Sequence, residues 1–187
     1  MYRPATGFTL LELLTTLALA AVIMVFAIPG MQSLVERHQA RSALQDLRAG
    51  IHLARQTAIN KNVNVIICPR REDTCGPRNT WHAGAIIFED RDNSRTRTAD
   101  DLIVGYLNPI PSGQIYWRAF RSRSYLKFTG SGLTDWQNGN LLYCPNNGDP
   151  TLARQLILNV AGRTYPSRDA NGNGIHEDTR GRDLSCS

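Results

Sequence analysis

The sequence predicts an α+β protein in which one long N-terminal helix packs on an antiparallel, β-rich head. Residues 7–30 form an apolar segment, residues 31–60 keep helical periodicity, and short β-rich runs separated by turn residues begin at residue 63. The chain has 187 residues, of which 42% are apolar and 20% charged. This composition is typical of a folded protein, and the length suits one domain with an appended element.

The apolar segment has the length of a membrane span. From Phe8 to Ile28 it contains one ionisable side chain, that of Glu12. A helix over residues 8–28 is about 30 Å long, which matches the hydrocarbon core of a bilayer. Arg3 is the only charge before it, so the positive-inside rule predicts a cytoplasmic N-terminus and an exported remainder. No A-x-A-like cleavage site follows Ile28, so we expect the helix to stay attached.

Residues 29–60 are predicted to be an amphipathic half of the same helix that lies against the head. Pro29 removes one backbone hydrogen bond, so we expect a bend or a local loss of helix there. The polar face carries arginines that are predicted to be solvated, with a partner contact as the alternative: Arg37, Arg41, Arg48 and Arg55. The apolar face is formed by residues spaced three and four apart: Leu44, Leu47, Ile51, Ala54 and Ala58.

Residues 61–187 are predicted to form the β-rich globular head. Gly, Pro, Asn and Asp clusters separate the apolar runs, which is typical of antiparallel strands joined by turns. The predicted strands lie within residues 63–68, 83–89, 101–107, 114–120, 124–130, 139–144 and 154–160.

The start of the chain resembles the N-terminal signature of type IV pilins and type II secretion pseudopilins. A short basic leader ends in Gly7, and Phe8 and Thr9-Leu10-Leu11-Glu12 precede the apolar run. The resemblance implies that residues 1–7 are a leader, which a prepilin peptidase removes between Gly7 and Phe8 before it methylates the amine of Phe8. Glu12 is then the fifth residue of the mature chain, and Pro29 lies where many pilins carry a helix-loosening proline.

Glu12 requires a physical explanation, because a charge at the centre of a membrane helix costs roughly 2.5 to 3.5 kcal/mol. Cleavage creates an amine on Phe8, four residues earlier on the same helix face. That amine, from its own or a neighbouring subunit, is the predicted partner of the Glu12 carboxylate. Opposite charges about 4 Å apart are worth roughly 4 kcal/mol at an effective dielectric of 20, enough to set the stagger between subunits. The alternative is a tolerated polar residue that snorkels to the interface.

The long helix, the wholly β head and a last strand of the ILNVAGR kind are similar to minor pilins and pseudopilins of the FimT/GspH type. The resemblance implies a pilin fold and a structural minor pilin of a type IV pilus, near the tip, with an inner-membrane anchor and a periplasmic head. Its partners are then other pilin or pseudopilin subunits, prepilin peptidase and the inner membrane. A minor pseudopilin of type II secretion and a DNA-binding pilin of natural transformation are the alternatives. The sequence has no G-x-S-x-G, H-E-x-x-H or phosphate-binding glycine loop, so we expect no enzyme.

Four cysteines in a domain predicted to lie outside the cytoplasm indicate two disulfides, with free thiols as the alternative. Four cysteines allow three pairings. We predict that Cys68 pairs with Cys75, because the intervening residues suit a hairpin-like turn. We predict that Cys144 pairs with Cys186, because the last cysteine then pins a free C-terminal tail.

DNA is a candidate partner because the net charge is +5, or +4 once Arg3 leaves with the leader. Gly162 and Arg163 match the first half of a G-R-x-R motif through which some FimT-type pilins bind DNA, but Tyr165 replaces the last arginine. A second basic run interleaves cations with aromatic residues, a pattern that suits phosphate binding and base stacking. The candidate residues are Arg163, Arg168, Arg180 and Arg182 near the C-terminus and Arg118, Arg121, Arg123 and Lys127 in the second run, near Trp117, Phe120 and Tyr125.

Calcium is the candidate cofactor; no other is expected. Asp169, Asn171, Asn173 and Gly174 match the first half of a calcium loop, which needs oxygen ligands at alternate positions and a glycine at the turn. Arg180 occupies the twelfth position, where a bidentate glutamate belongs, although Glu177 and Asp178 offer oxygens nearby. The alternative is an Asn-Gly-rich polar turn. The segment EDRDNS from Glu89 is predicted to be a hairpin tip, with a calcium site as the alternative.

Overall fold

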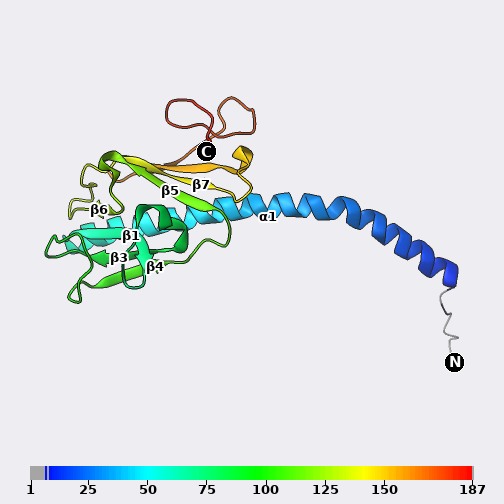
Figure 1. The fold of residues 1–187 in the computed structure, drawn as a ribbon, viewed down its shortest axis with the longest axis horizontal. Coiled ribbons are helices and arrows are strands. Elements are labelled where there is room, and N and C mark those ends of the chain that lie inside the picture. The colour runs from blue at the N-terminus through cyan, green and yellow to red at the C-terminus, as the bar shows by residue number, and fades with distance from the viewer. Residues whose placement is uncertain (1–6, 8, 187) are drawn as a thin grey trace. The chain divides into compact units, whose positions relative to one another are not determined.

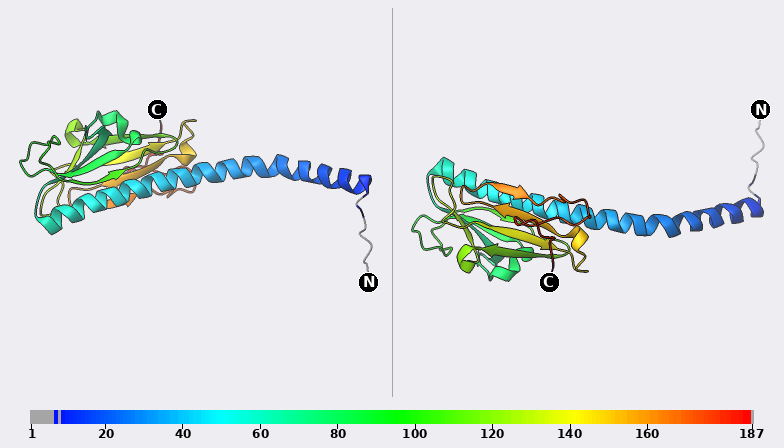
Figure 2. Two further views of the ribbon diagram at one scale, coloured as in Figure 1. Left: turned by 90° about the horizontal axis from the view of Figure 1, so that it is seen from below. Right: turned by 90° about the horizontal axis from the view of Figure 1, so that it is seen from above.

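The computed structural model describes residue 7 and residues 9–186, and within them one long helix precedes nine short strands (Figures 1 and 2). The helix α1 runs Leu10–Lys61, 52 residues. The chain divides into two compact units, Met1–Arg37 and His38–Ser187. The second unit contains the end of α1 and all the strands, so the head as a compact unit begins before residue 61, the predicted boundary.

In the unit Met1–Arg37, α1 passes through position 29 without interruption. The predicted loss of helix at Pro29 is therefore wrong. A proline removes one hydrogen bond, and helix formation is cooperative, so long helical segments on both sides hold the backbone together. A bend at Pro29 stays a prediction. By length and composition α1 is able to cross a membrane.

The first sheet has five strands: β1 (Val65–Arg71), β2 (Thr74–Cys75), β3 (Ala85–Glu89), β4 (Ile103–Leu107) and β6 (Leu126–Phe128). Its order is β2-β1-β3-β4, and β6 also pairs with β1. Every pair is antiparallel. Ile66 of β1 lies opposite both Phe88 of β3 and Lys127 of β6, so these side chains share one face of the sheet.

The second sheet has four antiparallel strands in the order β5-β7-β8-β9. They are β5 (Gln114–Ala119), β7 (Gly139–Cys144), β8 (Arg154–Leu158) and β9 (Thr164–Pro166). Short 3₁₀ helices lie between strands at Arg78–Ala83, Phe120–Ser122 and Pro150–Leu152. The residues after β9 form loops. Near their end, Leu184 and Cys186 pack against residues of the second sheet.

The main core lies between the C-terminal half of α1 and one face of each sheet. Alternate residues of the strands point inward. Trp81 and Trp117 pack there with ring centroids 6.0 Å apart. The predicted helix face is buried as expected: Leu44, Leu47, Ile51, Ala54 and Ala58. Leucine, isoleucine and aromatic residues of the strands complete this core: Ile67, Ile87, Ile115, Leu126, Phe128, Leu141, Tyr143, Leu156 and Leu158.

Each of the seven runs expected to be strands overlaps one, and β1 extends three residues beyond its run, to Arg71. β2 and β9 were not predicted, because each is too short to show alternation. β9 contains Pro166 and lies at the edge of its sheet, where a residue without an N–H is tolerated. The α+β fold class, a long helix followed by an antiparallel head, is confirmed.

Candidate functional site

The start of α1 carries the residues expected to act in assembly. Thr9 precedes the helix and acts as its N-cap, because its Oγ1 accepts a hydrogen bond from the backbone N–H of Glu12 at 3.2 Å. Glu12 lies in the first turn, where a negative charge is favoured by the helix dipole. Its carboxylate is exposed and has no ion-pair partner among residues 7 and 9–186. Gly7 is exposed, and Phe8, with the bond expected to be cleaved, lies outside the described residues.

The apolar side chains on both sides of Glu12 are exposed all around the helix. Leu10 is 77% exposed and Phe26 76% exposed. A helix with an apolar surface on every side is stable only when something apolar covers it. Within the part of the unit Met1–Arg37 that is described, nothing does so. This segment therefore needs lipid or other helices.

Both predicted disulfides are confirmed. Cys68 of β1 pairs with Cys75 of β2 across the short hairpin between them. Cys144, the last residue of β7, pairs with Cys186 and so ties the C-terminal segment to the second sheet. Leu184 is buried beside this bond.

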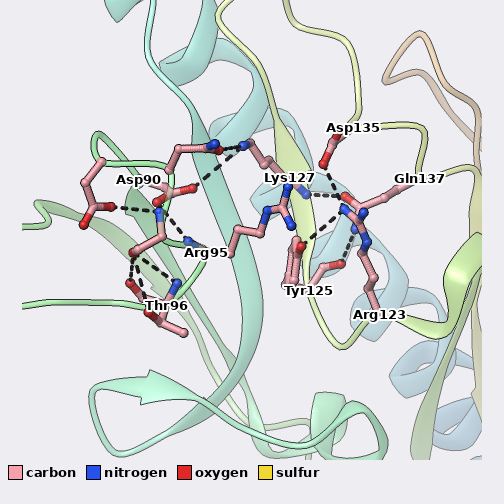
Figure 3. A network of polar contacts seen from close by, with 11 residues as sticks. Asp90, Arg95, Thr96, Arg123, Tyr125, Lys127, Asp135 and Gln137 are labelled. Carbon is pink, nitrogen blue, oxygen red and sulfur yellow. Dashed lines mark hydrogen bonds and ion pairs between the residues drawn. The ribbon is translucent and has the colours of Figure 1, made fainter.

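Residues 90–101, which we call the aspartate loop, lie beside a buried lysine, Lys127 (Figure 3). The Oδ1 of Asp90 accepts the backbone N–H of Arg95 at 3.2 Å, and Asp92 accepts that of Ser94 at 2.9 Å. Lys127 is 5% exposed; its Nζ hydrogen-bonds to Oδ1 of Asn93 and lies 3.9 Å from Oδ2 of Asp90. Burial raises the pKa of Asp90, and the charge of Lys127 opposes that rise.

The buried ammonium contradicts the prediction that Lys127 belongs to an exposed DNA-binding cluster. Arg123 of the same run donates to Asp135 at 2.8 Å and to the hydroxyl of Tyr125 at 3.2 Å, so its charge is also matched (Figure 3). The aromatic Trp117 is buried, and the side chain of Arg121 lies outside the described residues. Lys127 and Arg123 therefore have structural partners, whereas Arg118 of the same run is exposed.

Residues 169–178, which we call the C-terminal loop, have the expected alternation of oxygen atoms. Asp169 accepts the backbone N–H groups of Gly172 at 2.7 Å and Gly174 at 2.9 Å. Asn171 accepts that of Asn173, and Asn173 that of Ile175, at 2.9 and 2.8 Å. Gly174 has a φ of 88°, which favours glycine.

Glu177 closes the C-terminal loop from inside. Its carboxylate accepts the N–H groups of Ala170 at 2.8 Å and Asn171 at 3.2 Å. Across the described chain, no three His, Cys, Asp or Glu side chains gather into a metal site. A cation in this loop would therefore depend on the amide oxygens of Asn171 and Asn173 as well as Asp169, and calcium binding stays a prediction.

The four arginines expected to bind DNA are not gathered in one place. Arg163 is exposed in the turn between β8 and β9, and Arg168 is exposed just after β9. Arg180 and Arg182 line a cleft of about 490 Å³ together with Arg118 of β5. Arg182 forms an ion pair with Asp178 at 2.7 Å, which lowers the pKa of that carboxyl, chiefly through the hydrogen bond.

Gly162, the first residue of the partial G-R-x-R match, has a structural explanation. Its φ is 73°, and a Cβ there would lie 2.7 Å from the carbonyl oxygen of Gly132. Its N–H donates to the carbonyl of Asn159 at 3.0 Å. The tight turn therefore requires glycine without any reference to a ligand.

An apolar, uncovered N-terminal helix with one glutamate in its first turn, joined to a disulfide-linked antiparallel head, defines a pilin-like protein. Residues 2–28 match the model of the prokaryotic N-terminal methylation motif. Residues 43–162 match the family described as type II transport protein GspH. Because this second match spans more than half of the chain, the chain belongs to the GspH family.

Two solved structures share the fold, both of the type IV minor pilin FimU from Pseudomonas aeruginosa strain PAO1. The first has a TM-score of 0.54 and 19% identity, and covers 72% of this chain and 92% of that one. The second has a TM-score of 0.52 and 18% identity, and covers 68% and 92%. Comparison with curated protein sequences gives no significant match. The likeness confirms the predicted pilin fold.

Proposed function

We propose that this member of the GspH family is a structural minor subunit of a type IV pilus. In this proposal α1 anchors the precursor in the inner membrane, the head lies in the periplasm, and the subunit then joins a filament near its tip. The observation that carries the proposal is the apolar surface of α1, which is exposed on every side around the lone Glu12. A packed bundle of like helices supplies the covering that this surface lacks.

Glu12 is the proposed registration device within that bundle. Its carboxylate has no ion-pair partner among the described residues, and an unpaired charge in an apolar environment is costly. Processing would supply a partner in the amine of Phe8, on the same chain or on a neighbour. Pairing at one stagger and not at others would then fix the axial position of the subunit.

The test is the ratio of this protein in sheared surface filaments to that in membranes. Glu12→Ala is expected to lower the ratio roughly tenfold, since the lost ion pair is worth a few kcal/mol at most. Glu12→Gln should share the defect, because an amide cannot neutralise the amine. Both variants should keep the two disulfides and membrane insertion. Normal incorporation of both variants would contradict the proposed role.

Leader cleavage gives the matched control. A Gly7 variant is expected to remain in the membrane with its leader attached while Glu12 is intact, which separates processing from registration. A Gly7 variant that is cleaved and incorporated normally would contradict the proposed cleavage site.

A minor pseudopilin of type II secretion is the closest alternative, because the matched family is described as type II transport protein GspH. Deletion of the protein separates the two. Loss of surface pili with normal export of secreted enzymes supports the pilus. Loss of export with normal pili assigns the subunit to the secretion filament.

DNA binding is a weaker alternative that rests on exposed arginines. Arg163, Arg168 and Arg180 are exposed, and Arg182 is already paired with Asp178. Purified full chain in detergent should shift duplex DNA with a steep salt dependence if these residues neutralise phosphates. Absence of a shift at low salt, or a shift unaffected by Arg163→Ala and Arg168→Ala, counts against these residues.

A further inference from the structure

Among the described residues of the unit His38–Ser187, three arginines and no acidic side chain line a cavity of about 260 Å³. It lies between α1, β8, the end of β9 and the C-terminal loop. Its polar lining comes mainly from Arg41 and Arg48 of α1, Arg154 of β8, Ser167 and His176. We call it the arginine pocket.

The two helix arginines in this pocket lack counter-ions. Arg41 and Arg48 are seven residues apart, about two turns, so both point to the same side of α1. Both are exposed, and in the described part of the chain neither lies within ion-pair distance of a carboxylate. A protein that keeps two arginines together at a concave surface presents a strong positive potential.

Arg154 and His176 add to this potential from the opposite wall. The guanidinium of Arg154 donates to the carbonyls of Thr151 at 2.8 Å and Ala153 at 2.7 Å, which holds the cation at the wall of the pocket. Burial, followed by the charge of Arg154, lowers the pKa of His176, although Asp169 and Glu177 act in the opposite direction. The imidazole of His176 therefore lies within reach of the charge of Arg154 and of the carboxylates of Asp169 and Glu177.

The remaining walls are apolar, formed by Leu44, Leu156 and Pro166. A partly open, partly apolar pocket of this size fits a short carboxylate side chain with its aliphatic stem. A nucleic acid would need an extended track and aromatic platforms, and the described lining of this pocket contains no Phe, Tyr or Trp. A second copy of this chain is a poor source of the acid, because a net charge of +5 makes like copies repel.

We propose that the arginine pocket binds an aspartate or glutamate side chain on an acidic segment of a different filament subunit. The identity of the partner as a filament subunit rests on the proposed function, whereas the chemistry of the pocket does not. Arg41 and Arg48 would each donate to the carboxylate, and the pocket would select a heterologous neighbour over a second copy.

The test uses purified full chain in neutral detergent, with hexaglutamate as the probe and hexaglutamine as its uncharged control. Hexaglutamate is expected to bind and to raise the pKa of His176, read from its imidazole NMR signals. Arg41→Gln and Arg48→Gln should each weaken binding about tenfold, as expected for one charge-assisted hydrogen bond. Arg78→Gln, an exposed arginine outside the pocket, should leave binding unchanged.

Three outcomes would overturn the proposal. They are no binding of hexaglutamate, equal binding by Arg41→Gln and the wild type, and binding of inorganic phosphate or duplex DNA through Arg41 and Arg48 without binding of the peptide. Filament incorporation of the Arg41→Gln variant is measured separately from that of Glu12→Ala. A Glu12 defect with no peptide binding removes this proposal alone, and peptide binding without a Glu12 defect removes the proposed registration alone.

Discussion

The aspartate loop and the C-terminal loop share one hydrogen-bond pattern but neutralise their oxygen atoms in different ways. In each, the first aspartate accepts the N–H five residues later: Asp90 from Arg95 and Asp169 from Gly174. In each, the side chain two residues further on accepts the N–H of the residue two beyond it. The residue six places into each loop has a positive φ. Local spacing therefore produces the same turn twice.

The difference is the source of positive charge. In the aspartate loop a buried ammonium from Lys127 lies beside Asp90 and Asn93. In the C-terminal loop the acidic oxygens receive only backbone N–H groups and surface arginines. The comparison teaches that the turn is specified locally in both loops, whereas the counter-charge of Asp90 comes from a distant strand and that of Asp178 from a residue four positions away.

Removal of the internal cation is expected to have the largest effect. Lys127→Met leaves Asp90 buried without its counter-charge and should lower the free energy of unfolding by about 3 to 5 kcal/mol. Denaturant unfolding of the full chain in detergent measures this. Lys61→Met is the matched control. Lys61 is half exposed and its partner Glu89 keeps Arg91 at 2.7 Å, so the loss should be below about 1 kcal/mol.

The double variant Lys127→Met/Asp90→Asn tests whether Lys127 stabilises the fold through its charge interaction with Asp90. With both charges gone, most of the lost stability should return, and the double-mutant cycle should give a coupling of at least about 1 kcal/mol. Additive losses would mean that Lys127 stabilises the fold through packing alone.

The segment that contains the C-terminal loop is tied to β7 by the Cys144–Cys186 bond. Loss of this bond is therefore expected to destabilise that segment more than any other change in it. Replacing both cysteines by alanine is expected to cost about 2 to 4 kcal/mol and to speed amide exchange in residues 169–186. The Cys68–Cys75 pair, with a separation of 7 instead of 42, should cost less because it closes a shorter loop. Equal losses for the two pairs would contradict this loop-length argument.

The two loops should also respond oppositely to acid. Burial raises the pKa of Asp90, so the protonated, neutral form is favoured in the folded state and stability is gained as the pH falls through that pKa. The stability gap between Lys127→Met and the wild type should therefore narrow by about 1 kcal/mol between pH 7 and pH 4. The hydrogen bond from Arg182 lowers the pKa of Asp178, whose contribution is present above about pH 4 and is lost below it. A gap that does not change with pH contradicts the role given to Asp90.

Calcium is expected to have the smallest effect and to act on the C-terminal loop only. At a calcium concentration ten times its Kd, the melting temperature should rise by about 3 °C. Asp169→Asn should abolish the rise, and Asp92→Asn, at the corresponding region of the aspartate loop, should keep it. A rise that persists in Asp169→Asn would place the ion elsewhere.

Much of this architecture was predictable because its signals are local. The helix face from Leu44 to Ala58 and the seven strand runs follow from periodicity, and the Cys68–Cys75 bond follows from a short turn. Lys127 was not predictable in the same way. Its ammonium meets Asp90 only because β1 pairs with both β3 and β6, in a register that puts Ile66 opposite Phe88 and Lys127. Sequence spacing alone made it an exposed basic residue.

The arginine pocket was also beyond sequence reasoning. Arg41 and Arg48 were expected to be solvated, and Arg154 was not singled out. The pocket arises where α1 lies along β8 and where the C-terminal loop brings His176 beside Ser167. Such a convergence of distant segments leaves no motif.

The bond between Cys144 and Cys186 has a consequence for the order of events during biogenesis. In an exported head, the Cys68–Cys75 pair can oxidise once a short stretch of chain has emerged, whereas Cys144 must wait until residue 186 has crossed the membrane. Until then the thiol at the end of β7 is free to react with other partners. If the head is exported as proposed, the Cys144–Cys186 bond is therefore the later of the two to form, and a compartment that oxidises poorly would accumulate heads with an open C-terminal segment.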